Sequence, residues 1–164
     1  ASIAALRAIL PEDCLVGAGT VLRPADVQEV KAAGGTLIVM PHADADVIRA
    51  AKQAGMLCAP GVATPTEGMA ALANGADGLK LFPAEQLGPA VLKAWRSVFP
   101  RNTAMIPVGG VTPERMSEYW KAGATGFGIG SALYAPGISI QELEQRAQAF
   151  ATAARALPAR TNQA

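Results

Sequence analysis

A short pattern recurs four times along this chain and limits what it can fold into. Each copy closes an alanine-containing helical stretch, continues with a glycine and then opens a short apolar segment; the glycines are Gly34, Gly55, Gly75 and Gly123. Glycine suits the left-handed residue that ends a helix, where a positive φ strains other residues. The intervals are 21, 20 and 48 residues, the last being two units of 24. A unit of this length holds one strand and one helix, so the repeat predicts a β/α architecture.

The phase of the repeat predicts six strands. They are short and almost wholly apolar, which is typical of parallel strands covered on both faces. The chain is 51% hydrophobic and only 16% charged, which fits many doubly covered segments. The expected strands are 15–21, 36–40, 56–60, 78–82, 104–108 and 125–130. The expected helices are 3–10, 26–33, 44–53, 66–73, 89–98, 113–121 and 141–157.

Alternating strands and helices form either an open doubly wound sheet or a closed barrel. We favour the barrel because the units are uniform and the single early glycine fingerprint of a dinucleotide fold is missing. A (β/α)8 TIM barrel has eight strands. Because the chain opens on helix 3–10, we expect the first two β-strands of the barrel to be absent from this chain. The barrel domain is expected over residues 1–157, with 158–164 as a frayed C-terminal tail.

Charge and cysteine content narrow the classes of function. Fourteen basic and 13 acidic residues give a net charge of +1, which creates no strong field toward nucleic acid or a membrane surface. No apolar run approaches the roughly 20 residues that cross a bilayer. Cys14 and Cys58 have no second cysteine or histidine at metal-ligand spacing. We therefore expect a soluble, cytoplasmic protein with no metal, no cofactor, no nucleic-acid partner and no membrane partner.

Lys80 carries the clearest chemical signal in the sequence. Of the five lysines, it alone lies in the middle of an expected strand. Strand alternation puts Lys80 and Phe82 on one face, with Leu79 and Leu81 toward the covering helices. Burial disfavours an ammonium ion and lowers its pKa, which frees a neutral amine to form a Schiff base with a ketone. The alternative is a structural lysine paired with an interior carboxylate.

Two glycine-rich turns follow the last two expected strands. Gly109 and Gly110 lie between a strand and a helix, and Gly130 with Ser131 closes the next strand. Glycine lets backbone N–H groups approach an anion, and a helix N-terminus favours negative charge. In phosphate-binding barrels the site commonly lies in the loops after the seventh and eighth strands, where these turns would fall. The alternative is that the glycines serve only the turns.

Other polar residues near strand ends are weaker candidates. Gly19 and Thr20 end the first expected strand with a hydroxyl group, which could bind a carboxylate or simply form a tight turn. Glu67 and Glu85 follow later strands and could act as bases. For Glu67, a charge at the N-terminus of a helix is the simpler interpretation.

Five segments of the chain closely resemble the 2-keto-3-deoxy-6-phospho-sugar-acid aldolase family. They are 17–22 (GAGTVL), 60–67 (PGVATPTE), 79–85 (LKLFPAE), 108–113 (VGGVTP) and 130–131 (GS). The resemblance covers nearly the whole chain. It implies a class I aldolase on a (β/α)8 barrel that acts on a phosphorylated keto-deoxy sugar acid and forms a homotrimer.

The resemblance also implies roles for individual residues. Lys80 is similar to the Schiff-base lysine of the family, and Phe82 to its neighbour over the pyruvoyl group. Thr20, with the backbone of Gly19, resembles part of the carboxylate site, and Pro41 lines the same pocket.

The turns that follow the last strands resemble the family's phosphate site and its epimer-sensing position. Gly109, Gly110 and Ser131, with Gly130 beside it, are similar to the phosphate-binding residues. Val108 precedes the glycine pair, where members that act on 6-phosphogluconate usually carry threonine and phosphogalactonate-type members resemble this valine. Replacing a hydroxyl by an isopropyl group there changes the preference for one C4 epimer.

The resemblance thus implies metal-free cleavage of 2-keto-3-deoxy-6-phosphogalactonate to pyruvate and D-glyceraldehyde 3-phosphate, in galactonate catabolism. One alternative is a 2-keto-3-deoxy-6-phosphogluconate/4-hydroxy-2-oxoglutarate aldolase. Others are a different phosphate-binding barrel enzyme with a structural Lys80, or a non-catalytic truncated barrel that binds a sugar phosphate or a partner subunit. The family's acid/base glutamate, on its second strand, and its carboxylate-binding arginine, on its first, have no counterpart here.

Overall fold

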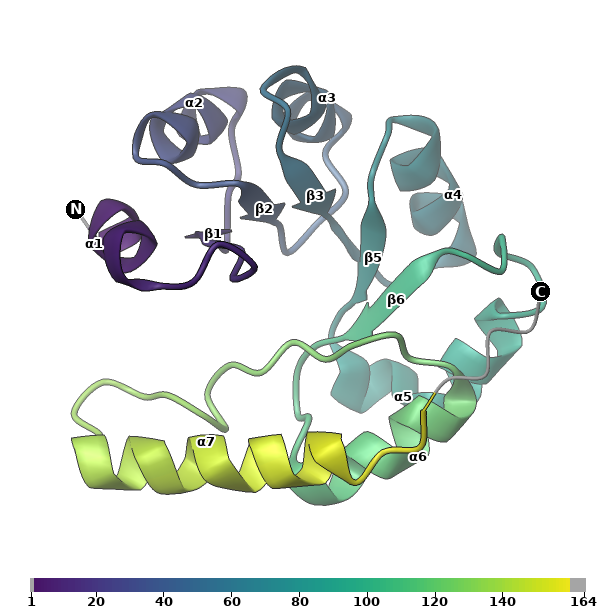
Figure 1. The fold of residues 1–164 in the computed structure, drawn as a ribbon. Coiled ribbons are helices and arrows are strands. Elements are labelled where there is room, and N and C mark those ends of the chain that lie inside the picture. The colour runs from purple at the N-terminus through teal and green to yellow at the C-terminus, as the bar shows by residue number, and fades with distance from the viewer. Residues whose placement is uncertain (1, 160–164) are drawn as a thin grey trace.

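The computed structural model describes residues 2–159, in which strands and helices alternate along the chain (Figure 1). The strands are β1 (Gly17–Ala18), β2 (Leu37–Val39), β3 (Leu57–Ala59), β4 (Gly61–Val62), β5 (Gly78–Leu81) and β6 (Ala104–Pro107). The α-helices are α1 (Ser2–Ile9), α2 (Pro24–Ala32), α3 (Ala45–Gln53), α4 (Pro65–Ala73), α5 (Ala84–Trp95), α6 (Met116–Ala122) and α7 (Ile140–Arg155). A 3-10 turn, η1 (Pro113–Arg115), leads into α6.

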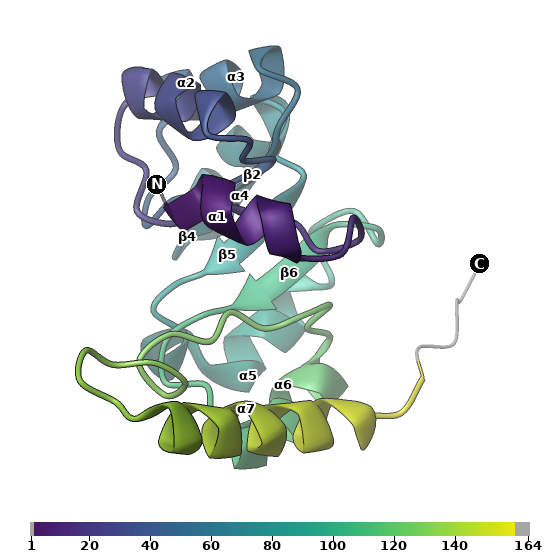
Figure 2. The same ribbon diagram turned by 60° about the vertical axis from the view of Figure 1, so that its left-hand side comes forward.

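The strands form two parallel sheets that adjoin at one proline. The first sheet has the order β1-β2-β3 and the second the order β4-β5-β6. Pro60 separates β3 from β4 and has no N–H group to donate. Its carbonyl still accepts a hydrogen bond from the N–H of Lys80 at 2.9 Å, so the second sheet continues from the first. Figure 2 shows α7 beside α6, at the opposite end of the molecule from α2 and α3.

The sequence predicted a (β/α)8 barrel whose first two strands are absent from this chain; the described strands form no closed barrel, and that prediction was wrong. Within residues 2–159 the hydrogen-bonded strands make two three-stranded sheets, with β1 and β6 at their outer edges. Closing a barrel requires eight tilted strands, the first of them paired with the last. The six short strands described here include no β1–β6 pair.

The strand expected over 125–130 is also not formed as a ladder. Its only bridge in the described residues joins Val108 to Gly128. Glycine at 126, 128 and 130 supplies no side chains to pack and lowers strand propensity. A Cβ on Gly128 would lie 2.4 Å from Cγ2 of Val108, so glycine is needed for the segment to approach β6.

The helix ends expected from the glycine pattern are confirmed. The four glycines have φ values of 87°, 68°, 97° and 112° at Gly34, Gly55, Gly75 and Gly123. At the other end of α3, the side chain of Asp44 accepts hydrogen bonds from two backbone N–H groups. Thr64 and Glu67 form a reciprocal capping box at the start of α4. These caps satisfy N–H groups that have no partner within the helix.

Helix α5 begins at Ala84, earlier than the expected range 89–98. The Gly88–Pro89 pair predicts a helix start, but the chain is already helical there and kinks at Gly88, where φ is 67°. The early start places Glu85 in the first turn of the helix, directly after β5. This position brings the end of β5 and the start of α5 beside the glycine turn that follows β6.

The core lies between one face of the strands and the helices. Leu79, Leu81 and Met105 are at most 1% exposed. Lys80 pairs with Ile106 across β5 and β6, so both side chains point to the opposite face of the sheet. One face of β5 is therefore apolar and covered, and the other presents Lys80.

The C-terminal end of the described chain packs back on α6. The indole Nε1 of Trp120 donates a hydrogen bond to the carbonyl of Pro158 at 3.0 Å. The tail expected over 158–164 lies outside the described residues from position 160 onward. The division into a domain at 1–157 and a tail stays a prediction. No helix among the described residues is both long and apolar enough to cross a bilayer.

Candidate active site

Lys80 lies in the centre of the second sheet. Its neighbours in register are Gly61 on β4 and Ile106 on β6. A Cβ on Gly61 would lie 2.4 Å from the carbonyl oxygen of Pro41, so the glycine lets the end of β2 approach β4. This approach places Pro41 one strand away from Lys80, and its role in lining the pocket stays a prediction.

The Lys80 amine lies in a partly buried, apolar setting. Its Nζ is 4.3 Å from the centre of the Phe82 ring. Burial lowers the pKa of the Lys80 amine. Each salt bridge in the described part of the chain involves other residues, so Lys80 has no carboxylate partner there. A half-buried amine without a counter-ion is the form in which lysine becomes a nucleophile.

The turn at Gly109 and Gly110 lies beside the end of β5. The two glycines have φ values of 101° and 64°. Val108 joins the two segments, because its N–H donates to Leu81 at 3.0 Å and its carbonyl accepts from Ala84 at 2.8 Å. Within residues 2–159 the N–H groups of Gly109 and Gly110 donate to no protein oxygen. The turn therefore presents unused donors close to the strand that carries Lys80.

Glu85 packs against this turn. A Cβ on Gly110 would lie 2.6 Å from Oε2 of Glu85, and one on Gly109 would lie 3.1 Å from the same oxygen. The turn thus has glycine both for its positive φ and for the close approach of Glu85. An exposed carboxylate at this place repels an anion that approaches the turn.

Arg115 and Tyr119 support the turn from the start of α6, and neither was predicted from the sequence. Arg115 donates from Nη1 to the carbonyl of Gly110 and from Nη2 to the hydroxyl of Tyr119, both at 3.2 Å. The Tyr119 hydroxyl donates to the carbonyl of Ala84 at 2.8 Å. An Arg and a Tyr four residues apart on a helix resemble an ordinary amphipathic face, so no local signal distinguishes them.

Gly130 and Ser131 lie two and three residues beyond the bridge between Val108 and Gly128. Both are exposed. The Gly130 carbonyl accepts hydrogen bonds from Leu133 at 2.9 Å and Tyr134 at 3.1 Å, which closes a turn. The bridge brings this second glycine turn to the same end of β6 as the first.

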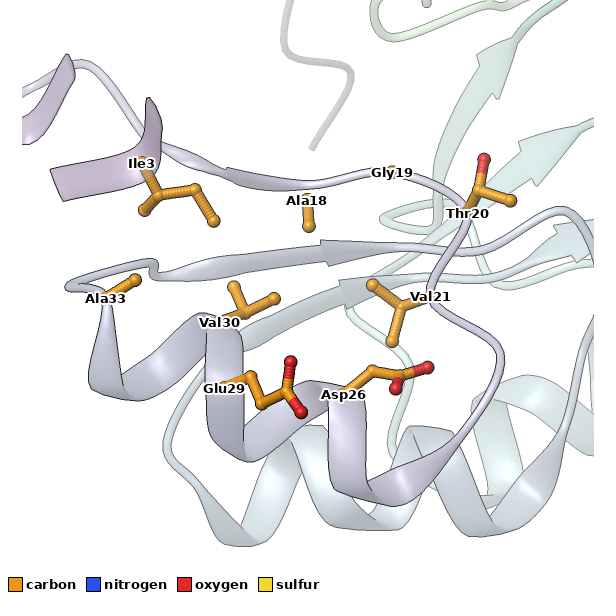
Figure 3. Close-up of a pocket in the computed structure, with 9 residues that line it drawn as sticks. All are labelled: Ile3, Ala18, Gly19, Thr20, Val21, Asp26, Glu29, Val30 and Ala33. Carbon is orange, nitrogen blue, oxygen red and sulfur yellow. The ribbon is translucent and has the colours of Figure 1, made fainter. Parts of the chain in front are cut away.

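Gly19 and Thr20 belong to the other sheet, in the loop between β1 and α2. Thr20 has a φ of 58°, which is strained for a β-branched residue. A cavity of about 340 Å³ lies on the α2 side of this loop and is lined in part by Asp26 and Glu29. Figure 3 shows the Thr20 side chain turned away from that cavity. Asp26 is paired with Arg23 at 2.6 Å, whereas Glu29 forms no ion pair in the described residues and disfavours an anion in the cavity. A carboxylate bound by the Thr20 hydroxyl would lie on the other side of the loop.

Glu67 acts as a helix cap, which confirms the simpler interpretation of this residue. Its Oε2 accepts hydrogen bonds from the N–H groups of Ala63 at 2.7 Å and Thr64 at 2.9 Å. The bond from Ala63 lowers the pKa of the Glu67 carboxyl group. A carboxylate held in this way has little capacity left to take up a proton.

The described residues contain no group of three or more His, Cys, Asp or Glu side chains arranged to hold a metal ion. Both cysteines are free thiols. Burial raises the pKa of the Cys58 thiol to about 11, so the thiol stays protonated. That no metal or cofactor takes part stays a prediction.

Two curated proteins are similar to most of this chain. One is a probable 2-dehydro-3-deoxy-6-phosphogalactonate aldolase of Rhizobium meliloti (strain 1021), 47% identical over 84% of this chain and 65% of that protein. The other is the 2-dehydro-3-deoxy-6-phosphogalactonate aldolase of Escherichia coli (strain K12), 44% identical over 94% of this chain and 75% of that protein. The chain thus spans about two thirds to three quarters of the length of these relatives.

Solved structures and a family model agree with these relatives. A native KDPGal structure superposes with a TM-score of 0.91 at 44% identity, covering 94% of this chain and 75% of that one. A KDPG aldolase from Legionella pneumophila, with pyruvate captured as a covalent carbinolamine intermediate, superposes with a TM-score of 0.75 at 27% identity, covering 96% of this chain and 75% of that one. The family model described as KDPG and KHG aldolase matches residues 1–157. The chain therefore belongs to the KDPG and KHG aldolase family, as its sequence motifs predicted.

Proposed function

We propose that the protein is a class I aldolase that cleaves 2-keto-3-deoxy-6-phosphogalactonate to pyruvate and D-glyceraldehyde 3-phosphate. The observation that carries the proposal is the Lys80 amine, half-buried beside Phe82 and without a carboxylate partner in the described residues. The names of the two relatives, at 47% and 44% identity, support the substrate. The covalent pyruvate adduct reported for the Legionella protein supports a Schiff-base route.

In this mechanism Lys80 supplies the electron sink. Its neutral amine adds to the C2 ketone, and the carbinolamine takes up a proton and loses water to give a protonated imine. A base removes the proton of the C4 hydroxyl, the C3–C4 bond breaks, and its electron pair moves to the imine nitrogen to give an enamine. D-Glyceraldehyde 3-phosphate leaves at this step. Protonation of the enamine at C3 and addition of water to the imine then release pyruvate and restore the amine.

The remaining predicted residues are proposed to hold the two ends of the substrate. Gly109 and Gly110 would bind the phosphate through their N–H groups, together with the turn at 130–131. Gly19, Thr20 and Pro41 would bind the carboxylate end. Binding energy gained at the phosphate, far from the reacting carbons, keeps the substrate in register and contributes to the rate as well as to affinity.

Val108 is proposed to set the preference for the C4 epimer. It extends β6 two residues beyond Ile106, and strand alternation places it on the same face as Lys80. Its isopropyl group offers no hydrogen bond to a C4 hydroxyl, so the site does not favour the epimer that needs one. The test is pyruvate release from 2-keto-3-deoxy-6-phosphogalactonate and from its gluconate epimer, measured with lactate dehydrogenase and NADH. A higher kcat/KM for the gluconate epimer would contradict the assignment.

The rate of Schiff-base formation is expected to rise with pH, with a midpoint below the pKa of an exposed lysine. Burial lowers the pKa of Lys80, so the neutral amine is present at a lower pH than in the unfolded chain. The unfolded chain then binds more protons between the two pKa values, and stability contributed by this group rises with pH across that window. The measurement is the initial rate of borohydride-trapped pyruvate adduct against pH.

The pH profile needs a reference in which the lysine is exposed. Acetylation of a short peptide that contains one lysine, followed by mass spectrometry over the same pH range, supplies it. Identical midpoints for Lys80 trapping and for acetylation of the peptide would contradict the lowered pKa.

Glu85→Gln is expected to tighten binding of a phosphate ester to the Gly109–Gly110 turn. Two unit charges about 4 Å apart repel by about 1 kcal/mol in water, so removing the charge should raise affinity about fivefold. The gain should fade at high ionic strength, because salt screens exposed charges. Calorimetric titration with sn-glycerol 3-phosphate measures it, with Glu144→Gln on α7 as a control. Unchanged or weaker binding by the Glu85 variant would contradict the expectation.

We also propose that the protein is a cytoplasmic homotrimer, a property carried over from the family resemblance. Large exposed apolar side chains such as Ile9 and Ile140, 77% and 83% exposed, fit a protein that buries further surface in an assembly. Light scattering coupled to size-exclusion chromatography tests the oligomeric state. A monomer at micromolar concentration would contradict it.

A further inference from the structure

A chain of hydrogen bonds links the turn after β6 to the end of the lysine strand through the side of α6. It starts at the Gly110 carbonyl, which Arg115 binds, and passes through the second terminal nitrogen of Arg115 to the Tyr119 hydroxyl. It ends at the carbonyl of Ala84, to which Tyr119 donates at 2.8 Å. Ala84 lies four residues after Lys80, and its own N–H donates to Val108 at 2.8 Å. Two connections therefore join the end of the strand that carries Lys80 to the proposed phosphate turn: the backbone bond from Ala84 to Val108, and the side chains of Tyr119 and Arg115.

The surroundings of Tyr119 fix the direction of these hydrogen bonds. Tyr119 is 1% exposed, and burial raises the pKa of its hydroxyl group although the Arg115 charge opposes the shift. The hydroxyl therefore stays protonated and can donate to Ala84 while it accepts from Arg115. Glu118 accepts a hydrogen bond from Nε of Arg115 at 2.8 Å, which holds the guanidinium in place. The guanidinium carbon also lies 5.2 Å from the centre of the Tyr119 ring.

Fixing the Gly110 carbonyl has a consequence for the turn. The carbonyl and the following N–H of a peptide unit point in opposite directions because the unit is planar. Holding the carbonyl on the Arg115 side therefore turns the next N–H, that of Val111, to the other side. Gly110 has a φ of 64° and no side chain to restrict it, so without this bond the turn has other conformations available.

We propose that Tyr119, together with Arg115, is a positioning residue that sets the distance between the phosphate-binding turn and Lys80. The inference rests on the proposed function and deepens it. Neither side chain touches the reacting atoms. Tyr119 acts through Ala84 on the strand end, and Arg115 acts through Gly110 on the turn. Because the pair fixes this distance, binding of the phosphate at the turn places the C2 ketone of the substrate next to the Lys80 amine.

Tyr119→Phe tests the proposal because it removes only the hydroxyl and keeps the buried ring. The readout is the ratio of kcat/KM for D-glyceraldehyde 3-phosphate to that for D-glyceraldehyde, each condensed with pyruvate. The variant is expected to lower this ratio about five- to tenfold, the range for one or two hydrogen bonds. Borohydride trapping of pyruvate at Lys80 involves no phosphate and is expected to keep its wild-type rate.

A role in stability alone would give a different result. If the substitution only destabilises the protein, kcat/KM falls by the same factor for both aldehydes and their ratio stays unchanged. That result would overturn the proposal. Arg115→Lys keeps one charged donor and should lower the aldehyde ratio only in part. Arg115→Gln should lower it as much as Tyr119→Phe does. The Arg115 side chain is 35% exposed, so its variants decide the matter if Tyr119→Phe does not fold. Arg49→Gln, on α3, removes an exposed arginine with a similar i,i+3 acidic partner and should leave the ratio unchanged.

A binding experiment shows whether a negative result contradicts the role inferred for Tyr119 or the proposed aldolase function. Titration with sn-glycerol 3-phosphate, which has no carbonyl group, needs no turnover. Wild-type protein that binds it but forms no pyruvate adduct would overturn the aldolase proposal, and with it the positioning role that rests on that proposal. Wild-type protein that binds it and forms the adduct, with an unchanged aldehyde ratio in Tyr119→Phe, would overturn the positioning role alone. Failure of the wild type to bind would overturn both the phosphate turn and the role inferred for Tyr119.

Discussion

Lys80→Met is expected to lower the rate of retro-aldol cleavage by at least about a thousandfold, because it removes the only covalent route to the electron sink. Methionine keeps an unbranched apolar stem of similar length, so it fits beside Phe82 without a polar group to bury. The folded state should be as stable as the wild type or more so, since a half-buried charge is no longer required. Pyruvate release gives the rate, and thermal unfolding gives the stability.

Two further variants show whether the loss belongs to the amine. Lys93→Met removes an exposed lysine of α5 and should leave the rate unchanged. Lys80→Arg keeps a positive charge but cannot form the imine at neutral pH, because the guanidinium stays protonated. Substantial activity in Lys80→Arg would mean that Lys80 has only a structural role, and it would contradict the mechanism.

Gly110→Ala is expected to lower kcat/KM for the phosphorylated substrate by about a hundredfold, comparable to the loss of one donor in an oxyanion site. The added Cβ would meet Oε2 of Glu85 at 2.6 Å and Cβ of the same residue at 3.0 Å, so the turn or Glu85 must move. Alanine at a φ of 64° also costs about 1–2 kcal/mol. The displaced N–H groups would no longer meet the phosphate together. Steady-state kinetics with phosphorylated and unphosphorylated substrates measures the effect.

Gly55 provides a matched control for this substitution. Its φ of 68° is close to that of Gly110, but nothing lies within 4 Å of the position that a Cβ would take. Gly55→Ala should therefore lose a similar amount of stability and keep the activity of the folded fraction. If Gly55→Ala and Gly110→Ala lose activity equally, the effect is strain alone and the phosphate role of the turn is contradicted.

Local chemistry explains how much of the fold could be predicted. The positive φ of Gly34, Gly55 and Gly75 follows from helix ends that are encoded within a few residues. Whether the sheet closes depends on strands that are far apart in the chain, and no local pattern reports it. Segment 125–130 also shows that local sequence does not determine strand pairing. Its apolar residues predicted a strand, but three of its residues are glycines and it forms a single bridge in the described residues.

The same distinction between local and long-range information applies to the residues of the candidate site. The position of Lys80 on the face of β5 opposite to Leu79 and Leu81 could be predicted from strand alternation, because a lysine in an apolar strand stands out in the sequence. Arg115 and Tyr119 could not, since their importance depends on reaching Gly110 and Ala84, segments that only the fold brings within reach. Glu85 was predicted near a strand end, but its contact with the glycine turn depends on the early start of α5.

The identity of the lysine that captures pyruvate tests the central claim most directly. Folded protein is incubated with pyruvate, reduced with borohydride, digested and analysed by mass spectrometry. The mechanism predicts a reduced pyruvate adduct on the peptide that contains Lys80, and on no other lysine at comparable yield. An adduct spread over the exposed lysines, or an unmodified Lys80 in protein shown to be folded, would contradict it.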